Sequence, residues 1–259
     1  MIELRNHRAT VLVDPDSGGR IAQFTLDGTS LLVAADSSLA DSLDWGLYPM
    51  VPFAGRLRHG VLRWRDDEHR FEPRRPPHAI HGTVDDVRWD VDHRDESSCS
   101  LSTRLVEPWP FDATVVHDVA LSDDRLEMRL TVHARDDTPV QLGWHPWFRA
   151  PVTIDLVARS IHVRDADGIA SPTPTPAVDL PWGDLDDCLS DVDENLTIVV
   201  DGCRLLARSS CRYWVVYDRP IHATCVEPQS GPPNVLNLDP PIVSAGSSIT
   251  EWFTLSWDV

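Results

Sequence analysis

The stretch that decides the fold class is Arg125–Ala134, with the sequence RLEMRLTVHA. Apolar and polar side chains alternate strictly along it, the apolar ones being Leu126, Met128, Leu130 and Val132. A period of two residues is typical of an antiparallel strand with one face on a core and the other in water. The stretch therefore predicts a half-buried strand.

Similar runs lie on both sides of this stretch. They predict strands at Thr10–Val13, Ile21–Leu26, Ala113–Leu121, Leu196–Val200, Tyr213–Tyr217 and Glu251–Trp257. No stretch keeps a 3.6-residue period over three turns, and the 21 prolines and 13 glycines fall mostly between the apolar runs. Many strands joined by short polar turns favour an all-β sandwich or barrel.

The proline-rich segment Ser171–Pro176 interrupts this rhythm. We expect a long surface loop there rather than an interdomain linker, because the strands after it could not easily close a core alone. The chain is accordingly predicted to form one domain over residues 1–259.

The composition limits the possible partners. The formal net charge of -18 makes a nucleic-acid backbone or an anionic membrane an unexpected partner. All 23 basic residues are arginine, so neither a Schiff-base lysine nor a P-loop lysine is available. No G-x-G-x-x-G, P-loop or zinc spacing occurs, so the sequence predicts no metal, nucleotide or redox cofactor.

The cysteines and the N-terminus bear on the compartment. The five cysteines are scattered and include no C-x-x-C pair, which favours a reducing environment. The first residues lack an apolar signal core, and no run approaches the ~20 apolar residues of a membrane span. We expect a cytoplasmic protein.

Two short motifs can carry acid–base chemistry. In Gly143–Phe148, strand alternation puts His145 and Trp147 on one face and their apolar neighbours on the other. In Cys225–Gln229, the same alternation puts Glu227 on the face of Gln229. Histidine exchanges protons near neutral pH, and a flat indole can stack on a small ligand. Taken singly, each of these residues is more often structural than functional.

With two further clusters, these motifs resemble the aldose 1-epimerase (galactose mutarotase) family. The four stretches stand in the family's order and are Tyr48–Gly60, His78–Gly82, Trp144–Phe148 and Glu227–Gln229. They are similar to its P-x-x-P-x-x-N-R-I, H-G, H-P-Y/W-F and E-x-Q elements. The resemblance covers nearly the whole chain and implies a super-sandwich of antiparallel sheets with a concave sugar site.

The resemblance also implies roles for individual residues. Glu227 matches the general base that takes the proton of the anomeric hydroxyl, and His145 matches the general acid that protonates the ring oxygen. The implied sugar contacts are His81, Arg56 and Asp186, with Asp187 one position away as the alternative to Asp186. Trp147 is expected to stack on the sugar.

Two positions depart from the family pattern. Gly55 stands where many members have asparagine, which removes one amide near Arg56. Asp85 stands where sugar-phosphate relatives have arginine, and we expect it to repel a phosphate. An unphosphorylated sugar is therefore favoured.

The sequence thus predicts an isomerase that interconverts the α and β anomers of a free aldohexose. One alternative is a non-catalytic carbohydrate-binding sandwich, and another is a relative acting on a phosphorylated or modified sugar. A metal enzyme built on His78, His81, His145 and Glu227 is disfavoured, because residues at i and i+3 point to opposite faces of a strand. The preferred sugar and the oligomeric state stay open.

Overall fold

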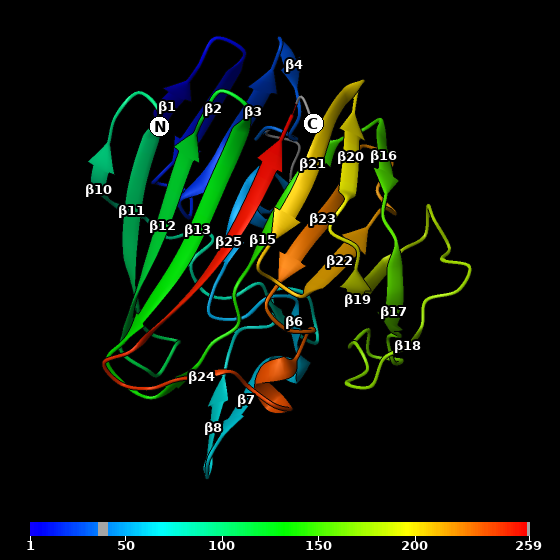
Figure 1. Ribbon diagram of the computed structural model, residues 1–259. Helices are drawn as coiled ribbons and strands as arrows, with labels where there is room; N and C mark the ends of the chain where they lie inside the picture. Colours follow the sequence, from blue (N-terminus) through cyan, green and yellow to red (C-terminus); the bar gives the residue numbers. More distant parts are fainter. Residues whose placement is uncertain (36–40, 258–259) are drawn as a thin grey trace.

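The computed structural model describes residues 1–35 and 41–257 (Figure 1). The larger of its two main sheets has eleven strands in the order β1-β2-β3-β5-β15-β23-β22-β19-β17-β18, with β4 beside β3. Their bounds are β1 Ile2–Arg5, β2 Ala9–Asp14, β3 Arg20–Leu26, β4 Thr29–Ser30, β5 Leu47–Met50, β15 Gly143–Arg149, β17 Ala158–His162, β18 Thr175–Pro176, β19 Asp186–Val192, β22 Tyr213–Tyr217 and β23 Ala223–Gln229.

The second sheet has eight strands in the order β10-β11-β12-β13-β25-β21-β20-β16. Their bounds are β10 Asp90–Arg94, β11 Ser98–Leu105, β12 Ala113–Leu121, β13 Arg125–Ala134, β16 Val152–Asp155, β20 Leu196–Val200, β21 Cys203–Ser209 and β25 Ser248–Ser256. Neighbouring strands in both sheets run antiparallel, as in the predicted all-β class.

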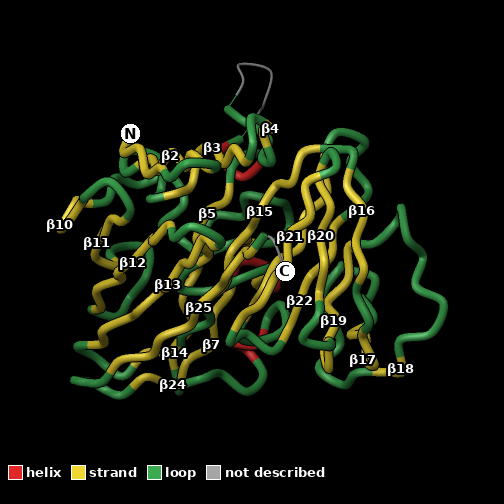
Figure 2. The backbone as a smooth tube through the Cα atoms, turned by 45° about the horizontal axis from the view of Figure 1, so that its top comes forward, coloured by secondary structure: helices red, strands yellow, loops and turns green. Residues whose placement is uncertain are grey.

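In the described part of the chain, the remaining elements are three two-stranded sheets and short helical turns. Three two-stranded sheets pair β6 Arg56–Leu57 with β9 Ala79–Ile80, β7 Val61–Trp64 with β8 Asp67–Arg70, and β14 Thr138–Pro139 with β24 Ile242–Val243. The helices of the described residues are single 3-10 turns at Ser42–Asp44, Arg58–Gly60 and Val235–Asn237, drawn red in Figure 2. None of them has the length or the apolar character that crossing a membrane requires.

The period-two prediction for β13 is confirmed in detail. Leu126, Met128, Leu130 and Val132 are all fully buried, while the residues between them are exposed or half-buried. The other predicted strands are also present, although the last begins at Ser248 rather than Glu251. The proline-rich Ser171–Pro176 lies in the long, largely exposed connection between β17 and β19, as expected for a surface loop, except that its last two residues form the short edge strand β18.

The main core lies between the two large sheets. Phe253 of β25 contacts Trp144 of β15 and Trp214 of β22, with ring centroids 6.0 Å apart in both pairs. The core cluster contains Leu126 and Trp257 on one side and Phe148 on the other. Since Trp144 and Phe148 face this core, alternation sends His145 and Trp147 to the opposite face of the eleven-stranded sheet.

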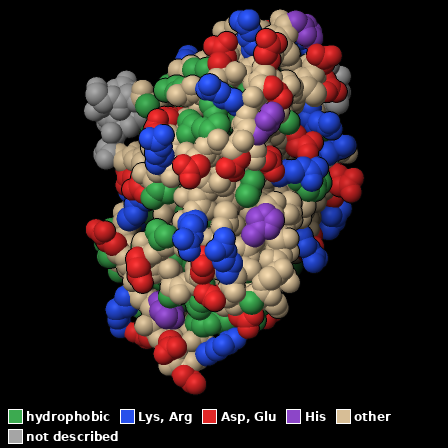
Figure 3. Space-filling model, turned by 90° about the vertical axis from the view of Figure 1, so that its left-hand side faces the viewer, with side chains coloured by type: hydrophobic (Ala, Val, Ile, Leu, Met, Phe, Trp, Pro, Cys, Tyr) green, Lys and Arg blue, Asp and Glu red, His purple; other side chains and the backbone are tan. Residues whose placement is uncertain are grey.

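The outer surface carries charges of both signs. Figure 3 shows acidic and arginine side chains interspersed over one face of the molecule. Although the formal net charge is -18, the acidic side chains on this face are separated by arginines and do not form a broad acidic patch.

Candidate active site

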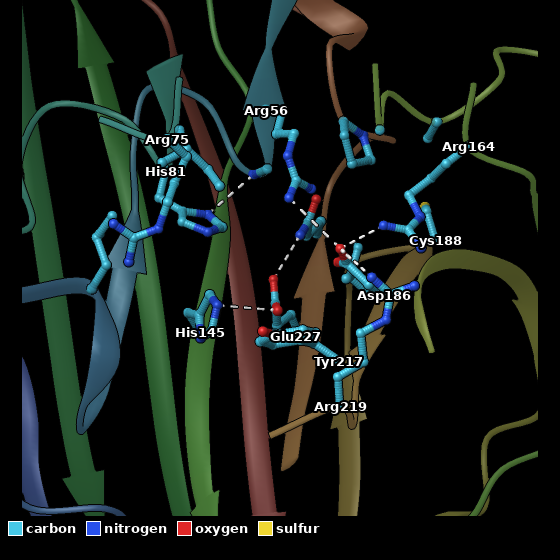
Figure 4. A pocket seen from close by; sticks show the side chains of 18 of the residues that line it. Arg56, Arg75, His81, His145, Arg164, Asp186, Cys188, Tyr217, Arg219 and Glu227 are labelled. Atoms are coloured by element: carbon cyan, nitrogen blue, oxygen red, sulfur yellow. Dashed lines mark hydrogen bonds and ion pairs between the residues drawn. The ribbon is translucent and has the colours of Figure 1, made fainter. Parts of the chain in front are cut away.

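A cavity of about 280 Å³ opens on the face of the eleven-stranded sheet that points away from the core (Figure 4). All six residues predicted for the site line it: Arg56, His81, His145, Trp147, Asp186 and Glu227. Asp187 and His78 are not among its lining residues. The structure thus brings together residues that are up to 171 positions apart in the chain (227 - 56).

The register of two central strands places the acid–base candidates. β15 pairs with β23 so that Gly143 lies opposite Gln229 and Trp147 opposite Cys225. By the same count, His145 lies directly opposite Glu227. Gly143 permits this pairing, because a Cβ there would lie 2.7 Å from the carbonyl oxygen of Pro228.

His145 and Glu227 are in direct contact. The distance between His145 Nε2 and Glu227 Oε1 is 3.2 Å, and both side chains are buried. Burial lowers the pKa of His145 to about 3. Burial, reinforced by the charge of Asp186, raises the pKa of Glu227 well above its ordinary value. Each group is favoured in its neutral form in the free protein.

Aromatic rings account for the burial of His145. Its imidazole stacks between Tyr48 and Trp147, with centroids 4.9 and 5.2 Å away. The carbonyl of Leu43 holds both rings, accepting hydrogen bonds from Tyr48 Oη at 3.1 Å and Trp147 Nε1 at 2.7 Å. Trp147, predicted to stack on a sugar, therefore stacks on the histidine. Tyr48 was not predicted, although it faces His145 in the pairing of β5 with β15.

His81 lies edge-on to His145, with ring centroids 4.8 Å apart. Its Nδ1 accepts a hydrogen bond from the backbone N–H of Gly55 at 3.3 Å, and burial lowers its pKa well below the ordinary value. A neutral imidazole that accepts at Nδ1 carries its hydrogen on Nε2. His81 can therefore donate a hydrogen bond through Nε2.

The packing of Pro233 against Gly55 accounts for the glycine at this position, where many family members have asparagine. Gly55 has a φ of +65°, and a Cβ there would lie 2.7 Å from Pro233 Cγ. An asparagine side chain has no room at this position. Pro233 itself lines the cavity where that side chain would point.

Asp186 is surrounded by three arginines, of which Arg56 was predicted and Arg164 and Arg219 were not. Its Oδ2 accepts from Arg164 Nη1 at 2.6 Å and lies 3.6 Å from Arg56 Nη2 and 3.9 Å from Arg219 Nη1. Arg164 also bonds Asp187, at 3.2 Å from Nε to Oδ1. Arg164 and Arg219 lie in irregular segments, where no periodic signal marks a residue as facing a site.

The expectation for Asp85 was wrong. Its side chain is fully buried, lies outside the cavity lining, and accepts from Arg74 Nη1 at 2.6 Å and Ser42 Oγ at 2.9 Å. A carboxylate neutralised in this way does not act on a ligand in the cavity. The segment after His81-Gly82 turns into the interior instead of following the cavity wall.

The four-residue metal site considered from sequence is not assembled. His78 Nδ1 accepts from the backbone N–H of His59, and its Nε2 bonds the carbonyl of Asp167. Among the described residues, His145, Cys225 and Glu227 do place one potential ligand atom each within 4.8 Å of one another. Burial raises the pKa of both Cys225 and Glu227, so two of these three groups hold the protons that a cation would have to displace.

Comparison with known proteins identifies the family. The family model described as aldose 1-epimerase matches residues 1–171, and the chain belongs to this family. A curated relative, the uncharacterized protein YphB of Escherichia coli K12, is 26% identical over 146 residues, which are 55% of this chain. That alignment spans only 50% of the length of YphB.

Solved structures agree on the fold. The galactose mutarotase/aldose epimerase homologue of C. elegans is similar with a TM-score of 0.86 at 18% identity, covering 99% of this chain and 98% of that one. A protein described as galactose 1-epimerase from Lactobacillus acidophilus has a TM-score of 0.82 at 15% identity, covering 99% and 93%. The fold is therefore galactose mutarotase-like.

Proposed function

We propose that this protein is an aldose 1-epimerase that interconverts the α and β anomers of a free aldohexose. The observation that carries the proposal is the buried contact between His145 Nε2 and Glu227 Oε1 at the wall of a cavity with hydroxyl-binding groups. Asp186, Arg56 and the Nε2–H of His81 supply acceptors and donors on the remaining sides.

The chemistry requires two coupled proton transfers. Ring opening removes the proton from O1 and adds one to O5, and closure on the other face reverses both steps. In the free protein, burial lowers the pKa of His145 and raises that of Glu227, so the pair favours a neutral imidazole beside a protonated carboxyl. We propose that a sugar between the two groups shifts this proton to His145, leaving a carboxylate and an imidazolium.

From that state the pair completes a balanced exchange. Glu227 takes the O1 proton while His145 gives one to O5, which breaks the C1–O5 bond and leaves a neutral pair and an open-chain aldehyde. After rotation about C1–C2, O5 returns its proton to His145 as it attacks C1, and Glu227 protonates O1. Each positioned acid–base group typically contributes ~10²–10⁴-fold to the rate.

The charges around the cavity support an unphosphorylated substrate. Its four lining arginines all have carboxylate partners: Arg56 with Asp186, Arg75 with Asp41 and Asp44, Arg164 with Asp186 and Asp187, and Arg219 with Asp184. A phosphate would have to compete with these carboxylates, whereas a neutral sugar can bond to both members of a pair.

Polarimetry tests the proposal. Freshly dissolved α-D-glucose or α-D-galactose should reach equilibrium rotation faster with the protein than without it, and Glu227→Gln should abolish the acceleration. Sugar binding without acceleration would identify a carbohydrate-binding protein instead. Acceleration confined to a 6-phosphorylated hexose would contradict the proposed substrate class.

A further inference from the structure

Gln229 is held rigidly beside the proposed catalytic pair. It is the last residue of β23, is fully buried and lines the cavity on the same strand face as Glu227. Its backbone is paired on both sides, with Gly143 of β15 and Tyr213 of β22. Its Nε2 donates to Glu227 Oε2 at 3.0 Å.

The other end of the Gln229 amide has no hydrogen-bond partner in the part of the chain that the structure describes. Three buried side-chain polar atoms of the described residues lack a hydrogen bond: Gln229 Oε1, His145 Nδ1 and Trp257 Nε1. Trp257 belongs to the core between the sheets, whereas the other two residues line the cavity. A buried acceptor without a hydrogen bond is destabilising, so a ligand hydroxyl that donates to Oε1 would remove this penalty.

The contacts of the two Glu227 oxygens indicate which sugar hydroxyl could reach Gln229 Oε1. Oε1 faces His145 and Oε2 faces Gln229, so these residues flank the carboxyl on different sides. In the proposed function, Glu227 serves O1 and His145 serves O5. The ring atom on the other side of C1 from O5 is C2, and its hydroxyl is the sugar group that falls toward Gln229.

We propose that Gln229 is a positioning and specificity residue, with Nε2 orienting the Glu227 carboxyl and Oε1 accepting a hydrogen bond from the C2 hydroxyl of the sugar. This inference rests on the proposed function and adds a substrate feature to it. The amide N–H also stabilises the carboxylate form of Glu227, because it opposes the rise in pKa that burial produces.

The test compares Gln229→Met with the unaltered protein on three sugars: α-D-glucose, 2-deoxy-D-glucose and 6-deoxy-D-glucose. The unaltered protein should prefer glucose over the 2-deoxy sugar by roughly 10-fold in kcat/KM, the usual effect of one hydrogen bond. In Gln229→Met this preference should fall toward one. The ratio of glucose to 6-deoxyglucose should stay the same in both, because C6 lies on the side of the ring oxygen.

A second readout separates positioning from a merely structural role. Removal of the amide donor should move the alkaline limb of the pH–rate profile of Gln229→Met to higher pH. Gln23→Met, an exposed substitution on β3, is the matched control and should change neither the ratios nor the limb.

Two results would overturn the inference while leaving the proposed function intact. One is equal use of glucose and 2-deoxyglucose by the unaltered protein, which needs no variant and so does not depend on whether Gln229→Met folds. The other is an unchanged glucose preference in folded Gln229→Met. Failure of the unaltered protein to accelerate any hexose would refute the proposed function itself.

Discussion

His145 and Glu227 face each other from adjacent central strands, and their nearest atoms are 3.2 Å apart with neither side chain more than 5% exposed. Sequence reasoning expected a protonated His145 in the working enzyme. The free structure instead favours a protonated Glu227 beside a neutral imidazole, because rings surround the histidine.

The pH–rate profile of kcat/KM should have a broad plateau at acidic to neutral pH. The pair holds one proton above the His145 pKa of about 3 and below the raised pKa of Glu227, and this is the proposed competent state. Activity should fall below the first value and above the second. Initial rates of mutarotation, with circular dichroism to verify folding at each pH, measure both limbs. An acid limb centred near pH 6.5 would contradict the neutral resting pair.

Glu227→Gln should be inactive and yet more stable than the unaltered protein at neutral pH. The folded pKa of Glu227 lies above its ordinary value, so its contribution to stability is present at low pH and is lost as the pH rises above about 4.5. The glutamine in the variant does not titrate, so the variant does not lose this stability as the pH rises. Urea unfolding at pH 4.5 and pH 8 should show its advantage growing with pH, whereas Glu3→Gln on the exposed face of β1 should show no such growth.

His117 should make the fold sensitive to acid. It is fully buried, with Nδ1 bonded to the Gly19 carbonyl and Nε2 accepting from Trp144 Nε1, and burial lowers its pKa to about 4. Stability from this group is complete above pH 6.5 and is lost as the pH falls toward 4. The full difference corresponds to about 3 kcal/mol.

His117→Gln keeps a donor and an acceptor but does not titrate. Its free energy of unfolding should therefore fall less between pH 6.5 and pH 4.5 than that of the unaltered protein. His133→Gln, on the exposed face of β13, serves as the control. An equal decline in His117→Gln and the unaltered protein would show that other groups cause the acid sensitivity.

Gly55→Ala should destabilise the fold by about 1–3 kcal/mol, because it adds a close contact to a left-handed backbone. The added Cβ would lie 2.7 and 2.9 Å from Pro233 Cγ and Cβ. Pro233→Gly removes both atoms, so the double variant should lose less stability than the two single changes added together. Strict additivity in urea unfolding would argue against this contact.

The sequence predicted which strand residues face the core better than it predicted the residues that enter the site from loops. Alternation in β13 and β15 fixed which residues enter the core, and it correctly put His145 on the face opposite Trp144. Periodicity carries no information on register, however. Only the pairing of β15 with β23 brings His145 opposite Glu227.

The residues that sequence reasoning missed lie where chain geometry is irregular. Arg164 and Arg219 enter the site from segments between strands, and their direction depends on ion pairs with Asp186 and its neighbours. Asp85 was misjudged for the same reason. Its distance along the chain from His81 is short, yet the backbone turns and leaves its carboxylate with Arg74.

The pairing of β15 with β23 has an evolutionary consequence. The proposed proton-transfer groups stand on two inner strands anchored by neighbours on both sides, whereas Arg164, Arg219 and Pro233 reach the same hollow from connecting segments. Changes in those connections can alter which carbohydrate is accepted without disturbing the chemistry beneath. Evolution can therefore change the loop residues that contact the carbohydrate while the two central strands and their proton-transfer groups stay the same.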